Sequence, residues 1–177
     1  MKSRSNNQIA LKPQDLLVLF KICGLRRETT TYAKLAEELA LSVSEVHASV
    51  RRADVARLLT LSEGIDPIRA SIKEFVLYGA KYAFPGVLGA VTRGMPTAYA
   101  APPLSQEILQ TGELPPIWPD PRGEQRGVAL YPLYPTVPIA ARKDSSLYEA
   151  LALFDSLRIG AARERERAAQ LLDIRLS

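Results

Sequence analysis

The residues best suited to chemistry lie in one short segment, from Ser42 to Arg52. At helical spacing, Ser44, His47 and Ala48 fall on one side, and Arg51 and Arg52 follow about two turns into the helix. Short or hydrogen-bonding side chains at the start of a helix can approach base edges in a major groove about 12 Å wide. Arginines further along can reach guanine edges or phosphates. The spacing therefore favours recognition of duplex DNA.

Catalytic patterns are missing from the sequence. His47 is the single histidine and Cys23 the single cysteine, so no Cys/His cluster offers metal-ligand spacing. Neither a phosphate-binding loop, a dinucleotide-binding loop nor a nucleophile elbow occurs. We therefore expect no enzymatic activity, no metal and no cofactor. Cys23 is interpreted as a small buried hydrophobic residue.

Three helices are predicted to position the recognition residues. They cover 13–23, 31–40 and about 43–57. One of three threonines, 29 to 31, is expected to cap the second helix. Ser42 and Glu45 have the spacing of a capping box at the start of the third. Hydroxyl groups and a lysine near a helix N-terminus suit phosphate contacts. The full set of predicted DNA-binding residues is Thr31, Tyr32, Lys34, Ser42, Ser44, His47, Ala48, Arg51 and Arg52.

The segment YAKLAEELALSVSEVHASVRRA resembles the helix-turn-helix of bacterial transcription factors, especially winged-helix proteins of the multiple-antibiotic-resistance regulator (MarR) type. The resemblance covers about residues 11–60. It implies a DNA-binding regulator of transcription with its recognition helix at about 43–57. Such proteins usually carry a basic hairpin after that helix, but here only about six residues separate Leu59 from Asp66. The wing is therefore expected to be short, missing, or supplied later by 87–99, with Arg93 near its tip.

The chain is expected to be mainly α, with an N-terminal (winged) helix-turn-helix, a proline-rich extended segment and a long C-terminal helix. The first region, 11–84, includes a short strand near Leu58–Leu61 and a fourth helix from Pro67 to about Tyr82, capped by Asp66. The second, 85–140, holds eleven of the thirteen prolines, which disfavour long helices and central strands. It includes a possible short hairpin at 87–99. The third, 144–173, is predicted to be one helix with a leucine seam.

Charge is distributed unevenly along the chain. The net charge is +4, and the first 60 residues carry ten Lys and Arg against six acids, while the remainder carries thirteen of each. Such an excess attracts a phosphate backbone. No signal peptide and no membrane-spanning run is recognised in the sequence, so a cytoplasmic protein is expected.

Two alternatives remain open at this point. The protein could be a protein-interaction adaptor or an antitoxin-like partner-binding protein whose helix-turn-helix is mainly structural. It could also combine DNA binding with a protein partner held by the proline-rich span or the C-terminal helix. Since one helix-turn-helix reads only a half-site, a DNA binder is expected to be a homodimer. The C-terminal helix is the candidate dimerisation element.

Overall fold

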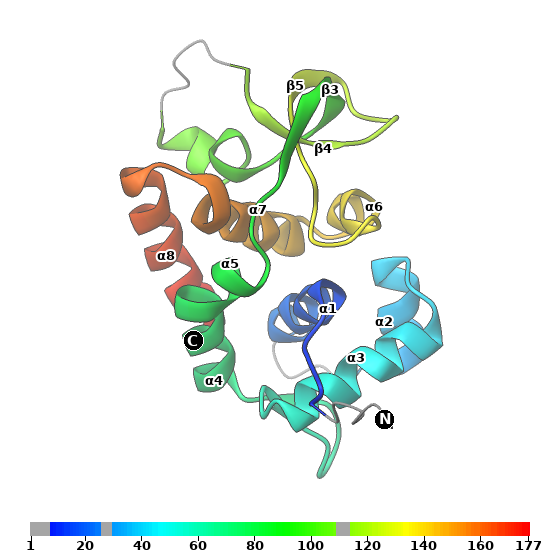
Figure 1. Cartoon of the computed structure of the whole chain (residues 1–177). Helices are drawn as coiled ribbons and strands as arrows, with labels where there is room; N and C mark the ends of the chain where they lie inside the picture. The colour runs from blue at the N-terminus through cyan, green and yellow to red at the C-terminus, as the bar shows by residue number, and fades with distance from the viewer. Residues whose placement is uncertain (1–7, 26–29, 109–113) are drawn as a thin grey trace, which may run out of the picture.

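The computed structural model describes residues 8–25, 30–108 and 114–177, and it is mostly helical with a small sheet (Figure 1). Five charged residues counted above for the first 60 positions, and one candidate capping threonine, lie outside the described residues: Lys2, Arg4, Arg26, Arg27, Glu28 and Thr29. Within the described ranges, every helix is too short or too polar to cross a bilayer.

The first three helices form close to where the sequence places them: α1 (Pro13–Gly24), α2 (Tyr32–Leu39) and α3 (Val43–Val55). Thr31 caps α2, because its Oγ1 accepts a hydrogen bond from the backbone N–H of Lys34 at 3.1 Å. The capping box of Ser42 and Glu45 is present at the start of α3. Helix α3 ends at Val55, two residues before the predicted end.

Helix α1 is enclosed on nearly all sides. Every residue from Asp15 to Cys23 is buried. One side of α1 packs against α2 and α3, and another packs against α7 (Ser145–Ile159), where the rings of Phe20 and Phe154 lie 5.8 Å apart. A helix buried all round needs partners on every side. The core therefore joins the N-terminal helices to the C-terminal half of the chain.

A two-stranded ribbon follows α3 directly. Strand β1 (Leu59–Thr60) confirms the short strand predicted near Leu58–Leu61, and it pairs antiparallel with β2 (Asp66–Pro67). The prediction that Asp66 caps a helix starting at Pro67 was wrong. The N–H of Ile68 donates to the carbonyl of Leu58 at 2.9 Å, which extends the ribbon, so helix α4 (Arg69–Glu74) starts later. The π-helical turn η1 (Phe75–Gly79) and α5 (Ala80–Ala83) continue the helical run.

The predicted hairpin at 87–99 is also wrong. Strand β3 (Leu88–Pro96) is a single strand that pairs antiparallel with β4 (Pro116–Pro119) and with β5 (Gln125–Leu130). Strands β4 and β5 pair in parallel, which closes a small barrel. Closure brings the backbones very close: a Cβ at Gly94 would lie 1.9 Å from the carbonyl oxygen of Trp118. Only glycine fits there.

The proline-rich region is thus more regular than its composition suggests. Strand β4 is paired on both sides, although it begins and ends with proline. Two short 3-10 turns, η2 (Ala98–Ala100) and η3 (Leu104–Gln106), connect β3 towards β4, and α6 (Val137–Lys143) follows β5. The expectation that this span lacks a central strand was wrong, because the prolines stand at the strand ends.

The single C-terminal helix predicted at 144–173 is instead two helices. Helix α7 ends at Ile159, and α8 (Ala162–Leu176) folds back against it. The break is at Gly160, which is buried. A Cβ there would lie 2.5 Å from the carbonyl oxygen of Ser156. The N–H of Ala161 then donates to Glu164 at 2.8 Å, which starts the new helix.

A buried carboxylate ties the barrel to the helices. Asp155 of α7 is 2% exposed, and its Oδ2 accepts hydrogen bonds from Thr97 Oγ1 at 2.7 Å and Trp118 Nε1 at 2.6 Å. Its Oδ1 accepts from Arg158 Nη1 at 2.7 Å. Arg158 also donates to the carbonyls of Phe84 and Pro85. Burial raises the pKa of Asp155, and Arg158 and the hydrogen bonds oppose that shift.

Replacing Asp155 by alanine should destabilise the fold strongly. The change leaves the Trp118 indole N–H, the Thr97 hydroxyl and the Arg158 guanidinium without their acceptor in the core. Breaking a buried ion pair in this way costs about 3–5 kcal/mol. Urea denaturation measures the loss. Asp173→Ala is the matched control, because the Asp173 side chain is half exposed and pairs with Lys73 at the surface. A change below about 1 kcal/mol for Asp155→Ala would contradict the assigned role.

Candidate nucleic-acid interface

The outer side of α3 is exposed. Ser44, His47 and Arg51 are exposed and follow one another at intervals of three and four residues. The opposite side is buried through Val46, Val50 and Ala53. Ala48 is half-buried. Three of the predicted residues therefore share one exposed strip along the helix.

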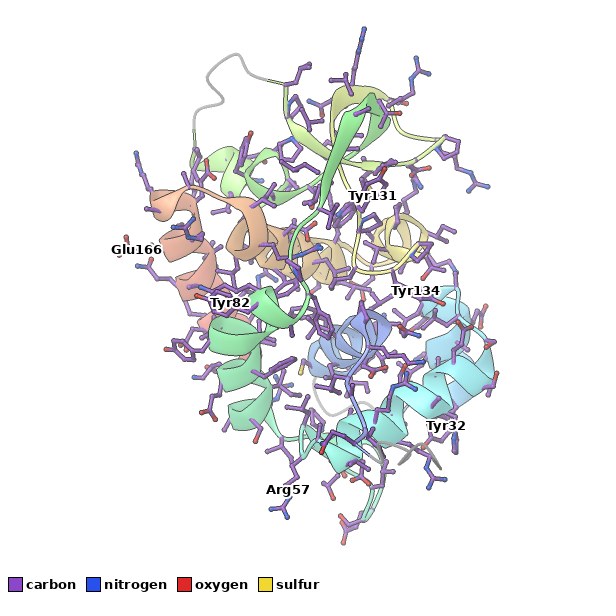
Figure 2. The ribbon with its side chains drawn as sticks, in the orientation of Figure 1. Tyr32, Arg57, Tyr82, Tyr131, Tyr134 and Glu166 are labelled. Carbon is purple, nitrogen blue, oxygen red and sulfur yellow. The ribbon has the colours of Figure 1, made fainter. Side chains whose placement is uncertain are left out.

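The start of α2 lies beside this strip. The ring of Tyr32 packs against that of His47, with centroids 5.0 Å apart (Tyr32 is labelled in Figure 2). Thr31 and Lys34 are exposed next to it. The N-terminus of α2, its capping hydroxyl and a lysine therefore adjoin the exposed side of α3. This combination is suited to contacts with a phosphate group.

Arg52 does not belong to the exposed strip. Its side chain turns towards α1, where Nε donates to Asp15 Oδ2 at 2.8 Å and Nη2 donates to Oδ1 at 2.6 Å. The Asp15 side chain is 1% exposed. The hydrogen bonds from Arg52 to Asp15 raise the pKa of Arg52. Because Nε and Nη2 both bind the Asp15 carboxylate, Arg52 holds α3 on α1, and its predicted contact with DNA is not supported by this geometry.

Ser42 is exposed but engaged in capping. Its Oγ donates to Glu45 Oε2 at 2.7 Å, and its N–H donates to the same oxygen at 2.9 Å. From the other side, the Tyr134 hydroxyl donates to Glu45 Oε1 at 2.6 Å. The hydrogen bonds from Tyr134 and from Ser42 lower the pKa of Glu45 from 4.5 to about 2. Glu45 therefore remains charged and links α3 to the chain after β5.

The C-terminal half also holds α2. Lys143, the last residue of α6, donates to the carbonyl oxygen of Glu37 at 2.6 Å, near the C-terminal end of α2. Lys21 of α1 forms ion pairs with Glu38 at 3.1 Å and with Asp144 at 2.7 Å. Burial opposes the charge on Lys21, but the two carboxylates outweigh it and raise its pKa. The positions of α2 and α3 therefore depend on contacts with residues 134–144.

The ribbon after α3 brings no positive charge to this surface. Its connecting turn, 61–65, contains Glu63 and neither Lys nor Arg. Arg93, expected near a hairpin tip, stands within β3 opposite Arg126 of β5, in the barrel at the other end of the molecule from β1 and β2 (Figure 1). The ribbon therefore adds no cation to the exposed side of α2 and α3.

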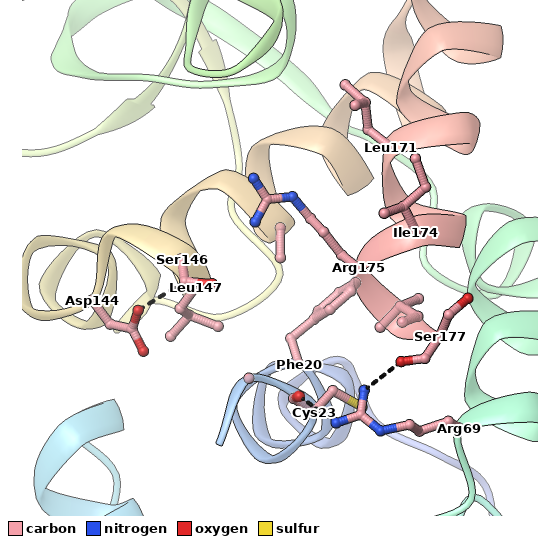
Figure 3. A pocket seen from close by; sticks show the side chains of 13 residues that line it. Phe20, Cys23, Arg69, Asp144, Ser146, Leu147, Leu171, Ile174, Arg175 and Ser177 are labelled. Atoms are coloured by element: carbon pink, nitrogen blue, oxygen red, sulfur yellow. Dashed lines mark hydrogen bonds between the residues drawn. The ribbon is translucent and has the colours of Figure 1, made fainter. Parts of the chain in front are cut away.

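A separate cavity of about 550 Å³ lies between α1, α4, α7 and α8 (Figure 3). Its arginines already have protein partners: Arg69 donates to the carbonyl of Cys23 at 2.8 Å, and Arg175 pairs with Glu149. Cys23 is buried, as expected, and burial raises its pKa to about 11, which suppresses the reactive thiolate. Among the described residues no group of three or more metal-ligand side chains comes together. We assign no ligand to this cavity.

Sequence reasoning missed Asp15, Tyr134 and Lys143. Each acts on α2 or α3 from a distant part of the chain; Tyr134 lies 89 residues from its partner Glu45. The sequence around Asp15 indicates only a role in capping α1, where Asp15 accepts a hydrogen bond from the N–H of Lys12 at 2.8 Å. Its pairing with Arg52 spans 37 residues, and helical periodicity carries no information about such a contact.

Arg52→Ala is expected to lower the free energy of unfolding by about 3 kcal/mol, because it leaves the Asp15 carboxylate buried without its cation. Arg51→Ala, which removes an exposed arginine next to it, should change stability by less than about 0.5 kcal/mol. Urea denaturation of the two single variants tests this difference. Equal stability of both would contradict the structural role of Arg52.

Tyr134→Phe should raise the pKa of Glu45 towards its ordinary value of 4.5, because the strongest hydrogen bond to the carboxylate is removed. The folded pKa lies below the unfolded one, so the stabilisation from Glu45 is present above about pH 4.5 and is lost as the pH falls towards 2. Carboxyl-carbon NMR titration of Glu45 measures the shift. Tyr131→Phe is the control, and an unchanged Glu45 pKa in Tyr134→Phe would refute the assignment.

Comparison with known proteins adds no family to this description. A scan against protein-family models found none that matches, and searches of curated proteins and of solved structures also found no match. The functional interpretation therefore depends on the geometry of α2 and α3.

Proposed function

We propose that this protein is a sequence-specific DNA-binding regulator of transcription that inserts α3 into the major groove. The observation that carries the proposal is the exposed strip of Ser44, His47 and Arg51 on a helix whose other side is fixed to the core. A rigid helix with its polar side free is what entry into the groove requires. In a bacterium such a protein acts in the cytoplasm, where the genome lies.

Each exposed residue has a role in this proposal. Ser44 and His47, in the first half of α3, face the base edges, and His47 is oriented by its packing on Tyr32. Arg51 contacts guanine or a flanking phosphate. Lys34 and the N-terminus of α2 hold the neighbouring phosphates. The ribbon β1–β2 takes the place of the wing in a winged helix-turn-helix, but without a cation it adds little to affinity.

Arg51→Ala is expected to weaken DNA binding about tenfold to a hundredfold, because one arginine contact with a base is worth about 1–3 kcal/mol. Fluorescence anisotropy with the duplex immediately upstream of the protein's own gene, at several salt concentrations, measures this. A random duplex of equal length separates specific from non-specific binding. Affinity of the wild type should fall steeply with salt.

Two further variants locate the effect. Arg163→Ala removes another exposed arginine, on α8, and should leave binding nearly unchanged. Arg51→Lys preserves the charge, so it should retain non-specific binding while losing specificity. Arg52 is unsuitable for this test, because its loss would disturb the fold. If neither duplex binds the wild type at low salt, the regulator proposal is refuted.

A second candidate, a protein-interaction adaptor, is favoured by apolar residues exposed on the barrel. Val87, Leu88 and Tyr131 are 54%, 56% and 54% exposed, and β3 and β5 bring them together, since the N–H of Tyr131 donates to the carbonyl of Val87. Exposed apolar groups that lie close together are typical of interaction surfaces. An adaptor would show no salt-dependent affinity for either duplex.

A further inference from the structure

Two tyrosines stand out on the helical run 69–83. Tyr78 and Tyr82 are 73% and 75% exposed, the highest values among the large hydrophobic residues of the described chain. They are four residues apart and therefore project from neighbouring positions of the run. Exposed aromatic side chains that lie close together are common in surfaces that a partner covers.

A groove opens on the same run, about two turns before Tyr82. It has a volume of about 530 Å³ and lies between the run and the C-terminal end of α3, where Arg57 is labelled in Figure 2. Its lining includes Leu58, Ser71, Glu74, Phe75 and Tyr78. Tyr82 does not line the groove of its own chain, so the chain carries both a projecting aromatic ring and an apolar hollow.

The spacing between Tyr82 and the groove is compatible with a dimer that has two-fold symmetry. If two copies of the run pack antiparallel with the axis at Tyr78, position 82 of one copy meets position 74 of the other. Each Tyr82 then lies over the groove of the partner beside its Glu74. Two-fold interfaces use the same patch on both copies, and this patch is complementary to itself.

Charge agrees with the same arrangement. Glu74 is exposed, and the Lys81 ammonium lies 5.1 Å from the centre of the Tyr82 ring. Seven residues separate Glu74 from Lys81, so they are two turns apart within one chain. The two-fold arrangement places Lys81 of each copy next to Glu74 of the other, which gives two opposite-charge pairs for each dimer.

The helix first expected to dimerise has most of its leucine seam in the core. The larger seam residues are mostly buried and pack within their own chain: Leu147, Leu151, Phe154, Leu157 and Leu172 are at most 4% exposed. The run 69–83 is therefore the better candidate surface.

We propose that the chain forms a two-fold dimer through the run 69–83, with Tyr82 of each copy seated in the groove between the run and α3 of the other. The inference deepens the proposed function, since a dimer supplies the two α3 helices that a two-part operator needs. Its test uses no DNA, so a negative result for the dimer can be distinguished from a negative result for DNA binding. Sedimentation equilibrium of the full chain should give a dimeric mass.

Charge reversal gives the decisive result. Glu74→Lys and Lys81→Glu should each weaken the dimer about a hundredfold, because each places like charges opposite one another twice. Mixing the two single variants should restore a dimer of one copy of each, since both contacts then join opposite charges. Thermal melts confirm that each variant is folded. The proposal would be overturned if the charge-reversed variants dimerised as tightly as the wild type. It would also be overturned if the wild type stayed monomeric at high micromolar concentration.

Two more variants fix the position of the axis. Tyr82→Ser should give monomers, whereas Tyr131→Ser, which removes an exposed tyrosine from the barrel, should leave the dimer intact. Tyr78→Cys should form a disulfide-linked dimer under mild oxidation, because the two copies of residue 78 meet at the axis, and the native Cys23 is buried. Tyr131→Cys is the matched control. Dissociation by Tyr131→Ser, or cross-linking in the Tyr131→Cys variant alone, would place the interface on the barrel and refute the proposal.

Discussion

A carboxylate in the core, Asp155 of α7, accepts hydrogen bonds from segments that are far apart in the sequence. The donors are Thr97 after β3, Trp118 of β4 and Arg158 in the next turn of α7. Arg158 also donates to backbone carbonyls of the segment before β3. A buried charge is tolerated only when its partners are complete. The barrel and the helices must therefore be assembled together, since neither supplies all the partners of Asp155.

Helix α1, which packs against α7, has a similar role for the N-terminal helices. Asp15 binds Arg52 of α3, and Lys21 binds Glu38 of α2 and Asp144 before α7. One largely buried helix thus contacts both helices of the candidate interface and connects them to the C-terminal half. The exposed strip of α3 owes its rigidity to these ion pairs, which lie behind it and leave its polar side free.

The features that the sequence predicts well are local ones. Helical periodicity and capping residues place α1, α2 and α3 within about two residues, and Ser42 with Glu45 is found as expected. Some of the failures depend on a partner far away in the sequence, and others on local pairing or packing that helical periodicity does not show. Asp66 pairs in a ribbon instead of capping a helix. Strand β3 pairs with residues about 20 to 40 positions later, and Gly160 ends α7. Arg52 has the periodicity of an exposed residue, yet Asp15 draws it inward. Helix and strand propensities depend on the local segment, whereas tertiary contacts decide which of the possible secondary structures the segment adopts.

The hydrogen bonds from Tyr134 and Lys143 to α3 and α2 have a consequence for how such a chain can evolve. Many recognition modules are exchanged between proteins as self-sufficient cassettes. Here a recombination event that carried only the first 84 residues into another protein would remove both bonds and uncover the side of α1 that faces α7. Helices α2 and α3 and the barrel are therefore expected to be inherited together, and to diverge by compensating substitutions across the boundary between them.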